Sequence, residues 1–194
     1  MHADTDSHWG VVKRILHYLW GTTTYDLHIT RNSSFDLHCF TDVDWAGSTD
    51  DRKSTGDYLV FFGQTTISWK SSKQRTVARS SIEAEYKALA DGTAEVIRLQ
   101  YLLIDLQIRS ASALTIWCDN LGATYLSVNP IFHTRTKHVE VYYHFVWDRV
   151  AKKEIQIRFI SSHVQLVDVL TKPLPTTLFT AFRFKLQVDL PPSV

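Results

Sequence analysis

Cysteine is scarce in this chain, and so is any excess of charge of one sign. Its 194 residues include two cysteines, and 21 lysines and arginines stand against 20 aspartates and glutamates. Cys39 and Cys118 each lie in an apolar run, so we expect buried free thiols in a reducing compartment and no disulfide framework. The near-neutral balance excludes a histone-like protein, so any contact with nucleic acid must come from a local basic patch.

Long apolar runs are also missing. No run approaches the roughly 20 residues that a membrane helix needs, and the first residues lack the basic and apolar regions of a secretory signal. We therefore expect an intracellular protein, in cytoplasm or nucleus, with no membrane partner. The length and mixed composition predict one globular domain with an appendage.

Apolar periodicity predicts an α/β protein. We expect an amphipathic helix over 8–20 that packs through its apolar stripe, a short strand over 25–30, and an antiparallel meander of three strands ending near 42, 62 and 69. A long helix over 81–106 follows. The later elements expected are a strand over 114–118, helices over 121–128 and 136–152, a strand over 155–160, a short helix near 168 and an amphipathic segment over 179–188.

Carboxylates stand at the ends of two of these strands. Asp42 ends the first strand of the meander, and Asp119 directly follows the strand over 114–118. A strand that arrives after a long helix is typically a parallel neighbour of an earlier one, which would bring the two acids together. Taken alone, an Asp in this setting is more often a hydrogen-bonded structural residue than a metal ligand.

Two further acids belong to helices. In the long helix, the stripe that includes Leu89 and Val96 extends backwards to Glu85, whereas Glu83 falls on another side. Asp168 lies in the last short helix. Four converging carboxylates would repel one another unless divalent cations lay among them, and oxygen-only ligands suit magnesium or manganese. Two such ions about 3.5–4 Å apart would support an in-line phosphoryl transfer.

A basic segment precedes the long helix. Lys70, Lys73, Arg75 and Arg79 lie among serines in an otherwise neutral chain. The segment is either a solvated loop or a set of phosphate contacts, since charge runs are commonly solvent faces.

Seven short motifs follow one another along the chain. They are T-D-V-D-W-A-G (41–47), D-R-K-S-T (51–55), R-T-V-A-R-S-S-I-E-A-E-Y (75–86), W-C-D-N (117–120), N-P (129–130), R-T-K-H-V-E (135–140) and Q-L-V-D-V-L-T-K (165–172). Together and in this order, they resemble one known family, the ribonuclease H domain at the end of copia-type retrotransposon Pol polyproteins. Residues 8–22, H-W-G-V-V-K-R-I-L-H-Y-L-W-G-T, also resemble the segment that joins reverse transcriptase to that domain.

The resemblance implies a ribonuclease H-like fold with a mixed five-stranded sheet, and Mg²⁺-dependent hydrolysis of RNA in RNA–DNA hybrids, with Mn²⁺ as the other candidate ion. It implies that Asp42, Glu85, Asp119 and Asp168 are the catalytic metal ligands. The partners of the chain would be the RNA–DNA hybrid and the reverse transcriptase portion of the polyprotein. The chain would divide into a reverse transcriptase remnant (1–34), the ribonuclease H-like domain (35–188) and a loose tail (189–194).

Some assignments stay open within this resemblance. Related enzymes place alanine three residues after the catalytic glutamate, which Ala88 satisfies for Glu85, and Glu83 is the alternative. Asp44 is either a residue that supports the ligands or a surface residue, and Asp42 is the expected ligand. Ribonucleases H often carry a mobile histidine before the last acid, but His163 is closer to that acid than usual.

Departures from the family pattern favour a second hypothesis, a folded but inactive remnant that at most binds nucleic acid. An integrase of related fold is weaker, because its glutamate would follow the second aspartate. No Tyr-x-Asp-Asp polymerase motif is present. The departures are Val43 and Val167 for alanine, Ile82 for threonine, Gly56-Asp57 for Ser-Gly, and Trp147 for arginine.

Overall fold

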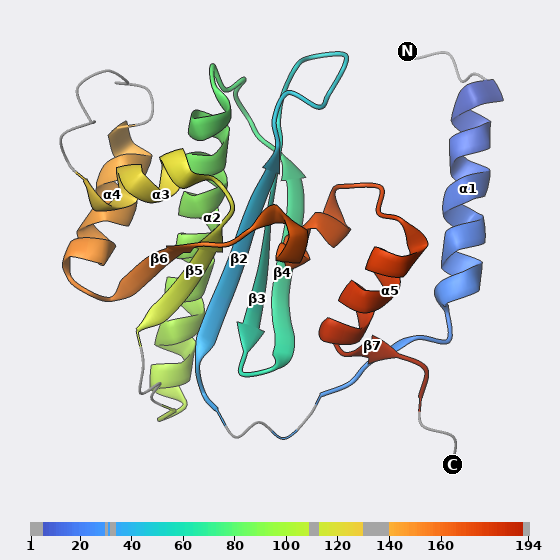
Figure 1. Ribbon diagram of the computed structural model, residues 1–194. Coiled ribbons are helices and arrows are strands. Elements are labelled where there is room, and N and C mark those ends of the chain that lie inside the picture. The colour runs from blue at the N-terminus through green and yellow to red at the C-terminus, as the bar shows by residue number, and fades with distance from the viewer. Residues whose placement is uncertain (1–5, 30, 32–33, 109–112, 130–139, 192–194) are drawn as a thin grey trace.

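A mixed five-stranded sheet forms the centre of the molecule, in the order β4-β3-β2-β5-β6 (Figure 1). The computed structural model describes residues 6–29, 31, 34–108, 113–129 and 140–191. The strands are β2 (Leu37–Asp44), β3 (Thr55–Phe62), β4 (Thr65–Lys73), β5 (Leu114–Cys118) and β6 (Ile155–Phe159). The helices are α1 (Asp6–Thr22), α2 (Ser81–Asp105), α3 (Leu121–Val128), α4 (Glu140–Ala151) and α5 (Thr176–Lys185), with 3₁₀ turns η2 (Ser162–Val164) and η3 (Leu166–Leu170).

Strand β2 is the centre of the sheet. It pairs antiparallel with β3, which pairs antiparallel with β4, so the predicted meander is confirmed. On its other side β2 pairs parallel with β5, and β5 pairs parallel with β6. The α/β class, the mixed five-stranded sheet and the parallel neighbour of the first strand are therefore as predicted.

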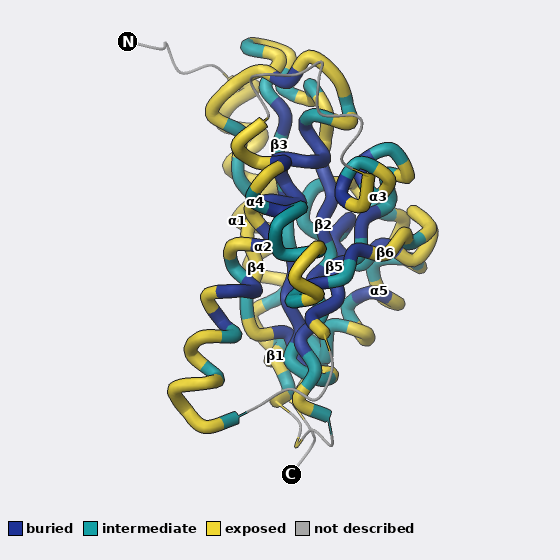
Figure 2. The backbone as a smooth tube through the Cα atoms, turned by 90° about the vertical axis from the view of Figure 1, so that its left-hand side faces the viewer, coloured by how far each residue is buried: buried dark blue, intermediate teal, exposed yellow. Residues whose placement is uncertain are grey.

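The two faces of the sheet are covered by different elements. Leu37 and Cys39 of β2 belong to the main core with Leu89 of α2. On the other face, Leu59 and Phe61 of β3 form a smaller core with Val167 of η3, Leu170 and Leu186. Figure 2 shows buried backbone concentrated along β2, β3 and β5. Both cysteines are free and buried, as expected.

Element boundaries differ from the prediction in several places. Strand β4 continues to Lys73, so Lys70 and Lys73 lie on a strand and not in a loop. Asp168 lies in a 3₁₀ turn, and α5 begins three residues before the expected segment over 179–188. In place of the strand expected over 25–30, the structure has the two-residue strand β1 (Asp26–Leu27). This strand pairs with β7 (Val188–Asp189), so Asp189, the first residue of the expected loose tail, belongs to a strand.

Helix α1 stands apart from the sheet in Figure 1. None of its residues is buried, so the prediction that it packs through its apolar stripe is wrong for this structure. The helix expected over 136–152 is described from Glu140 onwards. Outside the described residues lie the first turn of that expected helix, the basic residues Arg135, Lys137 and His138, and Pro130 of the N-P motif. No helix in the described part of the chain has the length and apolar character needed to cross a membrane.

Candidate active site

Parallel pairing of β2 and β5 puts two carboxylates at one edge of the sheet. Thr41 is opposite Cys118 in the register, so Asp42 and Asp119 are the next residues on two neighbouring segments. Asp119 directly follows β5, whereas β2 continues two residues beyond Asp42, which was expected to end the strand. Asp42 is 2 % exposed. Asp119 is half-buried and accepts a hydrogen bond of 3.0 Å from the Ser162 hydroxyl. Burial and the charge of Asp42 raise the pKa of Asp119, and the Ser162 hydrogen bond opposes them.

Helix α2 brings a third carboxylate to this edge. Its start is fixed by Ser80, whose hydroxyl accepts the backbone N–H of Glu83. Just over one turn later Glu85 is buried, and its Oε2 has no hydrogen-bond partner among the described residues. Burial, followed by the charges of Asp42 and Asp119, raises the pKa of Glu85 to about 9. A buried carboxylate with a free oxygen beside other acids is suited to bind a cation.

Glu83, the alternative glutamate, has partners for its carboxylate outside the acidic cluster. Its carboxylate pairs with Lys87 Nζ at 2.7 Å and accepts the backbone N–H of Arg79 at 3.0 Å. It therefore neutralises a lysine and caps the helix start. Of the two glutamates, Glu85 is the one whose titration depends on the other three acids. Its role as a metal ligand remains a prediction.

The fourth acid, Asp168, approaches from η3 and is 7 % exposed. Lys172 Nζ lies 2.8 Å from Asp168 Oδ1 and 2.8 Å from Asp42 Oδ2. Burial raises the pKa of Asp168 to about 6; the Lys172 hydrogen bond lowers it and Asp42 raises it further. The lysine was not singled out from the sequence, although its spacing of four residues from Asp168 is the available signal.

The donor set fits a hard divalent cation. Oxygens of Glu85 and Asp119 and the sulfur of Cys118 all lie within 4.8 Å of one another. Burial raises the pKa of the Cys118 thiol far above its ordinary range, so the sulfur stays protonated and is a poor ligand. The remaining donors are carboxylate oxygens, which suit Mg²⁺ or Mn²⁺ and not zinc.

A fifth acid lies beside the site and was missed as a site residue. Asp57 of β3 is the cross-strand partner of Asp42 and is 1 % exposed. Burial raises the pKa of Asp57, and the hydroxyls of Ser71 and Thr171 oppose this rise only in part. Neither hydroxyl makes a hydrogen bond of standard geometry to the carboxylate. Its place on the same sheet face as Asp42 follows from strand alternation, once the register is known.

The remaining candidates lie outside this cluster. His163 lies on η2 with an exposed side chain, and its neighbour Ser162, not the histidine, contacts Asp119. Asp44, at the end of β2, is exposed.

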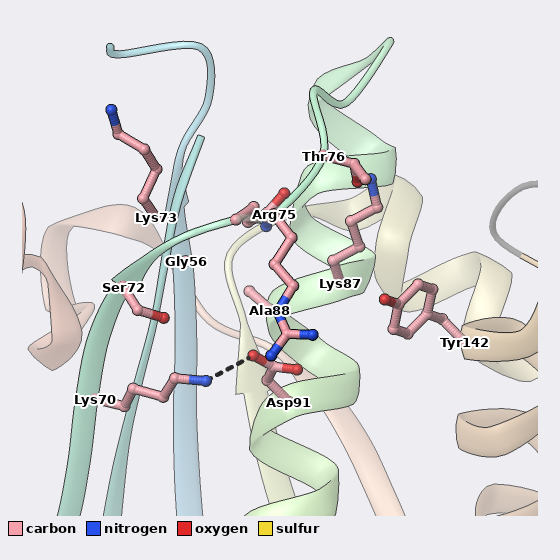
Figure 3. Close-up of a pocket in the computed structure, with 11 residues that line it drawn as sticks. Gly56, Lys70, Ser72, Lys73, Arg75, Thr76, Lys87, Ala88, Asp91 and Tyr142 are labelled. Carbon is pink, nitrogen blue, oxygen red and sulfur yellow. Dashed lines mark hydrogen bonds and ion pairs between the residues drawn. The ribbon is translucent and has the colours of Figure 1, made fainter. Parts of the chain in front are cut away.

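The basic segment lines a separate cavity of about 420 Å³ between β4 and α2 (Figure 3). Lys70 pairs with Asp91 at 3.1 Å, and Lys73 pairs with Asp51 at 3.2 Å. The Arg75 side chain extends into the cavity toward Asp91 in Figure 3. Arg79 is exposed and does not line the cavity. Three of the four predicted basic residues therefore share one hollow.

Sequence comparison finds relatives along the whole chain. It is 44 % identical over 194 residues to the retrovirus-related Pol polyprotein from transposon RE2 of Arabidopsis thaliana, covering all of this chain and 13 % of that protein. It is 39 % identical over 172 residues to the corresponding polyprotein from transposon TNT 1-94 of Nicotiana tabacum, covering 89 % of this chain and 13 % of that protein. The chain thus spans a small part of the relatives' length. No family model matches the sequence.

Structure comparison supports the fold. The chain superposes on LC11-RNase H1, isolated from compost by a metagenomic approach, with a TM-score of 0.51 and 14 % identity, covering 70 % of this chain and 92 % of that chain. A similarity at this identity concerns the fold alone. By sequence, the chain belongs to the copia-type retrotransposon Pol polyproteins, and its fold is ribonuclease H-like.

Proposed function

We propose that the chain hydrolyses the RNA strand of RNA–DNA hybrids endonucleolytically, with divalent metal ions, as the ribonuclease H part of a retrotransposon reverse transcriptase polyprotein. The observation that carries the proposal is the convergence of four carboxylates from β2, α2, the end of β5 and η3. The charges of the other three acids, Asp42, Asp119 and Asp168, each raise the pKa of Glu85. Such repulsion among buried acids favours a site that binds cations.

Asp42, Glu85, Asp119 and Asp168 would hold two Mg²⁺ ions, with Mn²⁺ as a substitute. When bound, such ions lower the pKa of water and stabilise the leaving oxygen of a phosphodiester. In the hydrolysis, a water molecule gives up a proton and its oxygen bonds to phosphorus, the bond from phosphorus to the leaving ribose oxygen breaks, and that oxygen takes up a proton.

Side chains around the acids would keep the ligands in place. The Ser162 hydroxyl donates to Asp119, and Gln165 Nε2 donates to the backbone carbonyl of Thr41 at 2.9 Å. The second bond ties the segment that carries Asp168 to the strand that carries Asp42. Ligands held on strands and helices in this way are better oriented than ligands on loops.

The basic segment supplies contacts to the nucleic-acid backbone in this proposal. Lys70, Lys73 and Arg75 line one cavity, and Arg79 lies beside the start of α2. Phosphate contacts position a nucleic acid without reading its sequence, as an enzyme acting on hybrids requires. Residues 1–34 would belong to the reverse transcriptase connection and residues 35–188 would form the catalytic domain. The reverse transcriptase portion of the polyprotein would be its partner.

The experiment is cleavage of an end-labelled RNA–DNA hybrid by the purified chain in Mg²⁺ and in Mn²⁺. We expect cleavage of the RNA strand, and a loss of at least about a hundredfold in Asp119→Asn, because one ligand charge is removed. Glu85→Gln is expected to lose cleavage similarly. Glu83→Gln, which removes the same charge two residues away, is expected to retain it.

The alternative is a folded remnant without activity. One departure from the family pattern, Val43, is accommodated: it is buried in a closed cluster with Ala78 and Ala84. A folded wild-type chain that cleaves no hybrid in either metal would establish the remnant. Cleavage lost in Glu83→Gln and kept in Glu85→Gln would instead exchange the roles of the two glutamates.

A further inference from the structure

A lysine side chain lies between two of the four acids. The Nζ of Lys172 is 2.8 Å from oxygens of both Asp42 and Asp168, which belong to different elements of the fold. The backbone fixes this approach, because the N–H of Lys172 donates to the carbonyl of Asp168 at 2.9 Å. One ammonium group thus occupies the position of a cation shared by the two carboxylates.

Burial explains why a cation is needed there. Asp42 is 2 % exposed and Asp168 is 7 % exposed, and Asp57 beside them is 1 % exposed. Ionised carboxylates removed from water are strongly destabilising unless a positive charge compensates. Lys172 supplies one charge to a cluster that carries more than one, so its compensation is partial.

The lysine is also able to leave. Its side chain is 40 % exposed, compared with 2 % for the side chain of Asp42. An ammonium on a flexible four-carbon stem can turn to solvent without unpacking the core. The carboxylates, in contrast, are fixed by β2 and η3.

We propose that Lys172 is the resident counter-cation of the metal-free site, and that a divalent ion binding between Asp42 and Asp168 displaces its ammonium. The choice of these two acids as ligands rests on the proposed function. Lys172 therefore stabilises the metal-free protein and weakens metal binding. It sets the metal concentration at which the site fills.

The test replaces Lys172 with methionine, which keeps an unbranched side chain of nearly the same length and removes the charge. Binding of Mn²⁺ to the full chain is measured from free Mn²⁺ by electron paramagnetic resonance, and metal-free stability by thermal unfolding in EDTA. We expect Lys172→Met to bind Mn²⁺ at least about tenfold more tightly. We expect its metal-free Tm to fall by at least about 2 °C.

Lys152→Met is the matched control. Lys152 makes the same kind of ion pair with the residue four positions earlier, Asp148, at 2.7 Å on the exposed end of α4. We expect it to change neither Mn²⁺ affinity nor metal-free Tm appreciably. Lys172→Arg keeps the charge, so its affinity should stay near that of the wild type. It also serves as the folded comparison if Lys172→Met unfolds.

Unchanged Mn²⁺ affinity in Lys172→Met, or affinity that falls, overturns the inference, as does tightening of at least about tenfold in Lys172→Arg. Binding of Mn²⁺ that disappears in Asp119→Asn locates the ion at this site independently of cleavage. A chain that binds Mn²⁺ there and cleaves no hybrid refutes the enzyme proposal alone. A chain that cleaves hybrid with unaltered affinity in Lys172→Met refutes the counter-cation alone.

Discussion

Asp57 is a buried acid in the position where the resembled family has glycine. Burial, the largest influence, together with Asp42 raises the pKa of Asp57 to about 6, and the hydroxyls of Ser71 and Thr171 compensate only in part. A carboxyl whose pKa is higher in the folded state binds its proton more tightly there than in the unfolded chain. Its ionisation therefore destabilises the fold.

The consequence is a pH-dependent gain in stability for Asp57→Asn. Below about pH 4 the carboxyl is protonated in both states, so asparagine and aspartic acid should be equivalent. Between about pH 4 and 6 the unfolded chain loses its proton first, so the wild type loses stability as pH rises. Above pH 6 Asp57→Asn should be more stable by up to about 3 kcal/mol. Urea unfolding in EDTA at pH 4 to 7 measures the difference.

Asp51→Asn is the control of opposite sign. A hydrogen bond from the Ser48 side chain, with Lys73 nearby, holds the pKa of the partly exposed Asp51 below its usual range. Its charge therefore favours the folded state, and this variant should lose stability at neutral pH. If Asp57→Asn is no more stable than the wild type at pH 7, Asp57 has a compensating partner in solution.

The sequence identified four of the acids that the structure brings together: local patterns pointed to three, and the family resemblance added Asp168. Asp42 and Asp119 follow apolar strands, and Glu85 continues an apolar helical stripe. Asp57 and Lys172 were missed as site residues because their contacts with Asp42 depend on the pairing of strands and on the path of the chain, which local sequence patterns do not reveal. Asp57 meets Asp42 only when β2 and β3 pair as they do, and Lys172 meets Asp42 only through η3.

Among the elements, α2 and β2 approach one another unusually closely at Gly92. A Cβ at this position would lie 2.7 Å from Cγ2 of Thr41 and 3.0 Å from the sulfur of Cys39. Both contacts are with buried β2 side chains, which have little freedom to move. The glycine therefore permits the helix to lie against the strand that carries Asp42.

Gly92→Ala is expected to destabilise the protein by about 1–3 kcal/mol, because the added methyl group overpacks the helix–strand contact. Gly10→Ala places the same substitution in the middle of α1, where nothing lies within 4 Å of the added Cβ. There alanine should be neutral or stabilise by up to about 1 kcal/mol. Urea unfolding of the two variants measures both effects. Equal stability of the two would show that α2 shifts to accept the methyl group.

Element types were predictable where periodicity was long, and boundaries were not. The stripe of α2 defined a helix within one residue at each end, whereas β4 extends four residues beyond the apolar run that predicted it. Lys70 and Lys73 are polar, yet they continue the ladder because β3 offers backbone partners as far as Thr55. Hydrogen bonding to a neighbour overrides side-chain pattern at a sheet edge.

At the scale of the whole molecule, α1 is joined to the domain without being packed on it. Val12, Ile15, Leu16 and Leu19 of its apolar stripe are all more than 40 % exposed. The chain that follows is tied to the domain by the β1–β7 pair and by Arg183, whose guanidinium lies 4.1 Å from the centre of the Tyr25 ring. These contacts lie beyond α1, so the domain does not depend on the helix for its core.

Removal of residues 1–22 is therefore expected to change the free energy of unfolding by less than about 1 kcal/mol, since no buried apolar surface is lost with α1. The shortened chain should also self-associate less, because a contiguous exposed apolar stripe favours aggregation. Urea unfolding measures the first effect and analytical ultracentrifugation the second. Replacing Leu16 with glutamate in the full chain is the matched control: it should lower self-association with stability unchanged. A loss above about 2 kcal/mol on deletion would mean that α1 packs against the domain in solution.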